Sequence, residues 1–428
     1  MTEIEARAER RRCPNCGSAV PQLHGWASWC ECGWGIAAPE TMTAPGRLAA
    51  LESRLGARLG RTLEQTFSEE DSLRPHVTAS RVLAYLVAGT WFVLLVGFPA
   101  IALWLVIQAP KNPFAWVFAV LAIGTAFVAR PRLGAAPDSG IVSRDQAPTL
   151  LRLVDEIAGR MATKPPHLVV VDHRWNASWG IVGIRRRRVL TLGLPLLAAL
   201  APAERVALIA HELGHERNGD VTRGIVVGGA LTGLGETAGL LVPDPGSPDS
   251  GAFDGLFELL LHGVMWLLSR PFVWAFVLEH AFLARDSQRA EYLADALAAD
   301  AAGTDAVIAL HEQLLAESTF FGAVQRSAIG RTDSDSTVFA DLLEGLRSMP
   351  ERERERRRRV ARLETSRLYD FHPPTAMRIR VLQARAHKEP QVTLEVGAAD
   401  RIDDELAGQR KDVATWLVDR YRSSLYYG

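Results

Sequence analysis

The pentapeptide HELGH at residues 211–215 combines two imidazoles and a carboxylate at a spacing that suits metal chemistry. Because residues four apart lie on one face of an α-helix, His211 and His215 can bind one zinc ion while Glu212 points at the water that the metal activates. Segment 201–210 has a proline and an acid in its first turn and then no helix breaker, which predicts the required helix. By itself, the motif also fits a surface helix with two solvated histidines.

A hydrolytic zinc site takes three protein ligands and leaves a position for water, so the two histidines predict a third ligand elsewhere. The best candidate is Glu291, in an alanine-rich segment that predicts a helix. Asp295 then lies one turn further on the same face, where it can accept the free N–H of a ligating histidine. Spacing leaves Asp220, Asp286 and Glu279 open as alternative ligands. Asp220, like Asp295, is also a candidate to support the ligands.

Five signatures follow one another along the chain. They are residues 169–177, residues 188–194, the HELGH motif with residues 218–220, residues 291–295, and residues 372–373 with 378–379. In this order they resemble the membrane-bound gluzincin family of HtpX-type and CAAX-prenyl-endopeptidase-type proteases. The similarity covers roughly residues 145 to 385, and the later signatures are independent of the pentapeptide.

The resemblance implies that one catalytic zinc ion is bound by His211, His215 and Glu291. Glu212 is then the catalytic base. A metal lowers the pKa of a bound water towards 7, so a carboxylate beside it can take the proton near neutral pH. The hydroxide that results attacks a peptide carbonyl.

The resemblance also implies that Asn176 holds the substrate backbone and that His372 and Arg378 line the cleft. From the residues alone, His372 is equally a turn residue before two prolines, and Asn176 equally caps a turn. Asn176 lies between the apolar runs 167–172 and 189–192, which predict two strands of a small sheet beside the zinc helix. An edge strand there could pair with an extended substrate.

The four cysteines, Cys13, Cys16, Cys30 and Cys32, lie in two close pairs separated by thirteen residues. This pattern predicts a tetrahedral structural zinc ion in a zinc-ribbon-like unit at residues 1–40. The second pair has one residue fewer between its cysteines than the usual motif, so a disulfide pair or redox unit stays open. A unit of this size needs its metal to fold, and it could also dock a protein partner.

The chain is 48% hydrophobic with a net charge of -1, which gives no bias towards nucleic acid. Residues 82–107 carry no charge and exceed the roughly 20 residues that cross a bilayer, and residues 114–129 complete a predicted transmembrane hairpin. Residues 224–242 and 256–283 predict two further spans, although their ionisable residues also fit buried helices. The mixed charges of residues 351–360 predict a solvated helix face.

Basic residues flank the hairpin, and its turn carries only Lys111. They are Arg74, His76, Arg81, Arg130 and Arg132. The predicted location is the cell membrane, as an integral membrane protein. The positive-inside rule predicts that the cysteine unit and the peptidase site face the cytoplasm. Reduced thiolates fit the same compartment.

Together these elements predict a mainly α fold with a small β-sheet. Polytopic membrane helices accompany a cytoplasmic zincin-like protease domain and a small N-terminal zinc ribbon. The expected parts are residues 1–40 as the ribbon, 41–75 as an amphipathic linker helix, 82–129 as the transmembrane hairpin, 140–388 as the gluzincin peptidase domain including both further spans, and 389–428 as a helical tail.

The predicted function is a zinc metalloendopeptidase that hydrolyses peptide bonds of unfolded, membrane-associated or prenylated polypeptides at the lipid bilayer. Two alternatives stay open: a catalytically silent membrane scaffold and a zinc-sensing adaptor, both of which use the ribbon to recruit partners. A scaffold would need its ribbon cysteines but would tolerate replacement of His211 and Glu212.

Overall fold

The computed structural model divides the chain into two units, each built from separate stretches of sequence. The first comprises Met1–Arg74, Ala135–Asn218 and Ala290–Gly428, and the second comprises Pro75–Gly134 and Gly219–Arg289. The structure describes residues 9–36, 46–69, 77–131, 134–183, 185–242, 252–330 and 337–427. Most described residues are helical and two small sheets are present, so the predicted fold class is confirmed.

The larger sheet of the first unit has the strand order β3-β4-β6-β5. Its strands are β3 (Ile141–Val142), β4 (Leu168–Asp172), β5 (Ala177–Val182) and β6 (Arg187–Gly193). β4 and β6 run parallel, whereas β5 pairs antiparallel with β6 and forms one edge. The predicted strands at 167–172 and 189–192 are therefore confirmed, and β5 lies next to the helix that carries HELGH.

Helices surround this sheet and complete the first unit. They are α5 (Pro148–Arg160), α6 (Leu194–Ala199), α7 (Pro202–Asn218), the end of α9 (Ala252–Ala302), α10 (Thr304–Leu314), α11 (Glu317–Ile329), α12 (Thr337–Arg347), α13 (Glu351–Leu363), α14 (Thr375–Ala384), α15 (Val396–Glu405) and α16 (Ala407–Tyr427). The tail predicted at 389–428 belongs to this unit, since the carboxylate of Glu405 accepts hydrogen bonds from the first backbone N–H groups of α5, at Thr149 and Leu150. Arg205 of α7 is buried and pairs with Asp403 at 2.9 Å.

Helix α2 (Arg47–Glu69) lies where the sequence predicts an amphipathic linker helix, at residues 41–75, of which residues 41–45 and 70–75 lie outside the described part. Its Leu63 and Phe67 are buried, and the Phe67 ring stacks on Tyr292 with centroids 5.1 Å apart. The apolar stripe of α2 therefore packs into the first unit, against α14 and α9. An amphipathic pattern alone does not distinguish a linker from a docked helix.

Helix α13 corrects the prediction that residues 351–360 form a solvated helix face. Trp29 of the N-terminal unit is only 1% exposed and lies beneath the guanidinium groups of Arg352 and Arg359, at 4.2 and 4.6 Å from the ring centroid. Its indole N–H donates to the Arg352 carbonyl oxygen at 3.2 Å. Cation–π contacts and this hydrogen bond hold the N-terminal unit on α13.

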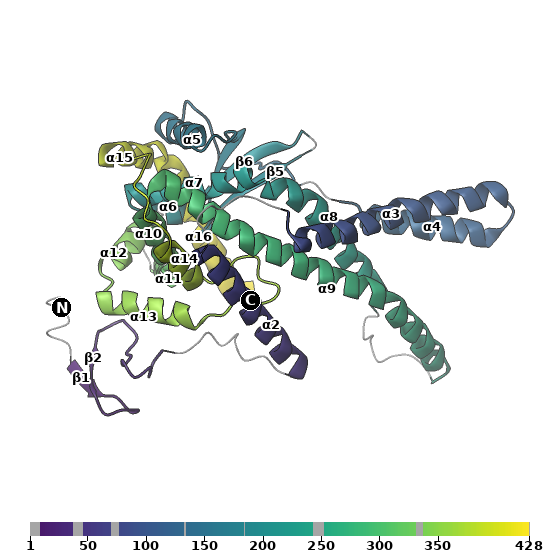
Figure 1. Ribbon diagram of the computed structural model, residues 1–428, viewed down its shortest axis with the longest axis horizontal. Coiled ribbons are helices and arrows are strands. Elements are labelled where there is room, and N and C mark those ends of the chain that lie inside the picture. The colour runs from purple at the N-terminus through teal and green to yellow at the C-terminus, as the bar shows by residue number, and fades with distance from the viewer. Residues whose placement is uncertain are drawn as a thin grey trace. The chain divides into compact units, whose positions relative to one another are not determined.

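The second unit contains α3 (Ala79–Gln108), α4 (Pro113–Val128), α8 (Asp220–Leu241) and the first part of α9. In Figure 1, α3 and α4 form a hairpin. A side chain at Gly233 would meet the Ala129 carbonyl oxygen at 2.6 Å and Trp91 at 2.8 Å, so this small residue lets α8 approach α3 closely.

Three helices among the described residues are long and apolar enough to cross a membrane: Ala79–Gln108, Gly224–Leu241 and Leu260–Ala302. They match the predicted spans at 82–107, 224–242 and 256–283. Helix α4 has 16 residues, or about 24 Å, less than the roughly 30 Å of a hydrocarbon core. Residues 243–251 and three of the basic residues that flank the hairpin, Arg74, His76 and Arg132, lie outside the described residues.

Candidate metal centre

Helix α7 places His211 and His215 one turn apart, with their ring centroids 4.9 Å from each other. The helix begins where the sequence predicts, and the Glu204 carboxylate accepts a hydrogen bond from the Ala201 N–H at 2.9 Å, which caps the first turn. His211 is 8% exposed, and Glu212 between the two histidines is 6% exposed. The motif therefore lies inside the first unit, which is inconsistent with two solvated histidines.

The end of α9 brings Glu291 to these histidines. Its Oε2 lies 3.4 Å from His211 Nε2, and its Oε1 lies 3.7 Å from His215 Nε2. Ligands about 2.05 Å from zinc at tetrahedral angles would be about 3.4 Å apart, so these separations fit one ion. Gly214 permits the approach, because a Cβ there would lie 3.0 Å from the Ala294 Cα. The HELGH pattern alone does not account for this glycine, which costs helix stability.

Asp295 lies beneath the ligands and is 2% exposed. Its Oδ1 is 3.1 Å from His211 Nδ1, as expected for a carboxylate that supports a ligating imidazole. Arg378 clamps the same carboxylate with Nε at 2.7 Å and Nη2 at 2.6 Å. His311, which sequence reasoning missed, adds its Nε2 at 3.1 Å from Oδ1. It follows Asp295 by sixteen residues in a separate helix, without a motif spacing that marks it.

Helix α14 and the loop before it bring two further predicted residues to Glu291. His372 is exposed, yet its Nδ1 lies 2.8 Å from Glu291 Oε1. Arg378 Nη1 lies 2.9 Å from Glu291 Oε2, and this side chain is only 9% exposed. Its guanidinium bridges the carboxylates of Glu291 and Asp295, and a role of Arg378 at the cleft stays a prediction.

The remaining candidates lie elsewhere. Asn176 is exposed just before β5, where its backbone carbonyl accepts a hydrogen bond from Gly193 at 2.9 Å. Asp286, in the second unit, pairs with Arg81 at 3.1 Å, and Glu279 is buried in that same unit. Asp220 begins α8 there, so its supporting role stays a prediction. Of the third-ligand candidates, only Glu291 groups with the two histidines among the described residues.

The carboxylates of Asp295 and Glu291 favour positive charge beside the two histidines. Burial alone would lower the pKa of His211, but hydrogen bonds with Asp295 and Glu291 raise it to about 10. Burial lowers the pKa of His215, which keeps that imidazole neutral as a ligand must be. Two imidazoles and one carboxylate, with ligand atoms within 4.8 Å of one another, are the donor set of a catalytic zinc ion.

The N-terminal cysteines form the second group. Cys13 Sγ lies 3.6 Å from Cys32 Sγ, and Cys16 Sγ lies 3.5 Å from Cys30 Sγ. A disulfide needs about 2.05 Å, whereas four thiolates around one zinc ion lie about 3.8 Å apart. Hydrogen bonds with Ser18 lower the pKa of Cys16 to about 6, which supplies a thiolate at neutral pH. The strands β1 (Glu9–Arg12) and β2 (Ala19–Gln22) form the hairpin that carries the first pair.

Comparisons with known proteins agree with the motif. The model of "Peptidase family M48" matches residues 144–386. A protease HtpX homolog of Acidiphilium cryptum is 30% identical over 164 residues, which cover 38% of this chain and 54% of that relative. Protease HtpX homolog 1 of Saccharolobus solfataricus is 34% identical over 93 residues, covering 22% of this chain and 30% of that relative.

The chain therefore spans about half of the first of these relatives and less of the second. Among solved structures, the crystal structure of S. mikatae Ste24p shares 14% identity. The match covers 78% of this chain and 72% of that one at a TM-score of 0.29, a value too low to carry an argument.

Proposed function

Because this chain belongs to peptidase family M48, we propose that it is a zinc-dependent membrane endopeptidase. It hydrolyses peptide bonds of unfolded, membrane-associated or prenylated polypeptides. The observation that carries this proposal is the buried group of His211, His215 and Glu291, whose ligand atoms lie within 4.8 Å of one another. Three ligands leave room for water at a tetrahedral ion, which distinguishes a hydrolytic centre from a structural one.

The chain's own side chains divide the chemistry between them. A zinc ion bound there supplies a Lewis acid that polarises water and a peptide carbonyl. Glu212 accepts the proton of the attacking water and returns it to the amide nitrogen that leaves. The exposed ring of His372 donates a hydrogen bond to the carbonyl oxygen as negative charge develops on it.

The substrate backbone is held by the sheet. Strand β5 is an edge strand beside α7, so its outer edge can pair with an extended peptide. Trp179 of this strand donates its indole N–H to Glu216 of α7 at 3.2 Å, which supports a fixed position of the strand against the helix. Asn176, at the start of the strand, is proposed to bind the substrate backbone.

The setting is a membrane. In the part of the chain that the structure describes, three helices are long and apolar enough to cross it, and basic residues flank the first hairpin on both sides. We therefore propose an integral membrane protein whose ribbon and peptidase site face the cytoplasm. In α13, Glu353 pairs with Arg356 and Arg357, and the Arg352 guanidinium lies over the Trp29 ring. Because these charges have partners within the protein, nucleic acid is not among the proposed partners.

Full-length Glu212→Gln protein in detergent tests the mechanism. We expect it to retain its zinc, since this side chain is not a ligand, and to cleave casein or a model peptide about two to four orders of magnitude more slowly. Glu156→Gln, the same change at an exposed glutamate of α5, is the control and should keep most of the activity. Cleavage rates of the parent protein on prenylated and unprenylated forms of one peptide distinguish between the substrate classes.

Full cleavage by Glu212→Gln would overturn the proposed mechanism. If the parent protein binds zinc but cleaves neither casein nor any model peptide, the silent scaffold becomes the better account.

A further inference from the structure

His311 is a buried histidine that the proposed chemistry does not use. It is 1% exposed, and its Nε2 lies 3.1 Å from Asp295 Oδ1. The same oxygen lies 3.1 Å from His211 Nδ1. His311, Asp295 and His211 therefore form one chain of contacts that begins in α10 and ends at a metal ligand.

The chemistry of the three groups fixes which atom donates. Asp295, clamped by the Arg378 guanidinium, is a carboxylate and only accepts hydrogen bonds. Burial lowers the pKa of His311, so its imidazole is neutral and carries one N–H. That N–H lies on Nε2 and donates to Asp295.

The other ring nitrogen of His311 lowers the stability of the fold. His311 Nδ1 is buried and has no hydrogen-bond partner among the described residues. An unsatisfied buried polar atom destabilises the fold, and an apolar side chain of similar volume would fill the space without that cost. The contact with Asp295 is the interaction of His311 that an apolar residue cannot replace.

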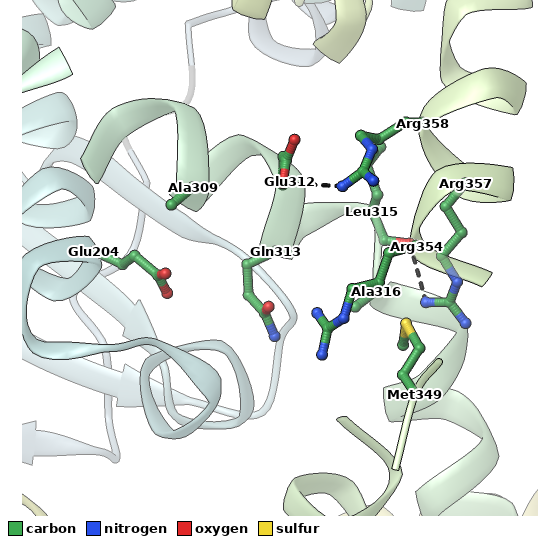
Figure 2. Close-up of a pocket in the computed structure, with 10 residues that line it drawn as sticks. All are labelled: Glu204, Ala309, Glu312, Gln313, Leu315, Ala316, Met349, Arg354, Arg357 and Arg358. Atoms are coloured by element: carbon green, nitrogen blue, oxygen red, sulfur yellow. Dashed lines mark hydrogen bonds and ion pairs between the residues drawn. The ribbon is translucent and has the colours of Figure 1, made fainter. Parts of the chain in front are cut away.

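Contacts at the C-terminal end of α10, which carries His311, fix the position of this helix. Figure 2 shows the adjacent Glu312 directed towards Arg358 of α13, with Oε2 and Nη1 3.5 Å apart. The carbonyl oxygen of Leu315 accepts from Arg357 at 3.3 Å, and that of Leu314 accepts from the Trp175 indole at 3.3 Å. The C-terminal end of α10 is thus attached to α13 and to the segment before β5.

We propose that His311 is a positioning residue for the metal centre, which acts by orienting Asp295. Arg378 approaches the carboxylate through two nitrogens and neutralises its charge, and His311 adds a neutral donor on the oxygen that faces His211. Asp295 then holds the Nδ1 of His211, so that Nε2 of this ligand points towards Glu291. The inference rests on the proposed function, because it assigns His311 to the same centre.

The test compares full-length His311→Leu and His311→Gln proteins with the parent. Leucine fills the space but cannot donate, whereas the amide of glutamine can donate to Asp295. We expect leucine to weaken zinc binding at the peptidase site and to lower kcat by about 10- to 100-fold each, with KM near the parent value, and glutamine to restore most of both. Chelator competition measures zinc affinity, with the ribbon zinc as an internal reference.

His387→Leu makes the same change at a half-exposed loop histidine and should alter neither quantity. The melting temperature of metal-free His311→Leu should equal or exceed that of the parent, since the unpartnered nitrogen is gone. A leucine variant with parental zinc affinity and kcat would overturn the proposal. A leucine variant that melts at a lower temperature and loses both zinc ions would also overturn it. The same holds for a glutamine variant whose zinc affinity and kcat are as low as those of the leucine variant.

The outcome for the proposed function is separate. If the parent cleaves no peptide but His311→Leu still weakens zinc binding and His311→Gln restores it, the peptidase proposal fails and the positioning role stands.

Discussion

The two metal-binding groups differ in where their ligands come from. The ribbon takes Cys13 and Cys16 from one turn and Cys30 and Cys32 from another, all within the first 32 residues. The peptidase centre takes two histidines from α7 and its carboxylate from α9, which lies far along the chain. One group is assembled by local turns, and the other needs the packing of two helices.

The difference extends to what surrounds the ligands. Four thiolates form a closed set, typical of a structural ion. The peptidase group has three ligands, and next to it Asp295 pairs with Arg378 and contacts the neutral ring of His311. A hydrolytic centre thus needs an open position for water and a buried network that orients its ligands. The predictions below ask whether the two groups are independent, and how far the second depends on helix packing.

Replacing Glu291 by alanine should have the largest effect. It removes the ligand that only the tertiary fold supplies, and it leaves the buried Arg378 guanidinium with one carboxylate partner fewer. We expect the peptidase zinc to be lost and peptide cleavage to fall on the order of a thousandfold or more. Metal analysis should still find the ribbon zinc. Loss of both ions from a folded chain would show that the two groups are coupled.

Gly214→Ala should have an intermediate effect. The new Cβ would lie 3.0 Å from Ala294 Cα and 3.2 Å from its Cβ, so α7 and α9 must move apart. Overpacking of this kind costs about 1–3 kcal/mol, and a misplaced catalytic group can cost about a hundredfold in rate. Thermal unfolding and kcat measure the two consequences. The control is Gly159→Ala in α5, where no atom lies within 4 Å of the new Cβ; equal effects at both sites would refute the packing argument.

Replacing all four ribbon cysteines by serine should have the smallest effect on cleavage. The small unit should lose its zinc and unfold, because it has little apolar core of its own. The contacts that the structure describes for Trp29 of the ribbon lead to α13, which carries none of the peptidase ligands, so cleavage should stay within about tenfold of the parent. A thousandfold loss, measured on the same model peptide, would instead make the ribbon part of the peptidase.

Local chemistry made much of this predictable. The strands β4 and β6 follow the apolar runs that predicted them, because such runs record which residues are buried, and α7 begins at the proline and acid that predicted its first turn. The cysteine group also follows from spacing, since its ligands lie within two turns. Glu291 was identified by residue type and by a family resemblance, and the packing of α9 on α7 explains its contact with the histidines.

Other features could not be read from the sequence, because a pattern shows what a helix can bury but not what covers it. The apolar face of α2 fits a linker or a docked helix, and the structure shows it packed on Tyr292. The charges of α13 suggested a solvated face, but two of its guanidinium groups lie on Trp29. His311 has no motif, and no spacing shows that Arg378 bridges Glu291 and Asp295. Each depends on contacts between segments far apart in the chain.

The most direct test of the account is X-ray absorption at the zinc edge on the full-length protein with all four cysteines replaced by serine. The account predicts one zinc ion per chain with nitrogen and oxygen neighbours at about 2.0–2.1 Å and no sulfur at about 2.3 Å. A folded variant that binds no zinc would contradict it, because His211, His215 and Glu291 would then not form a metal site.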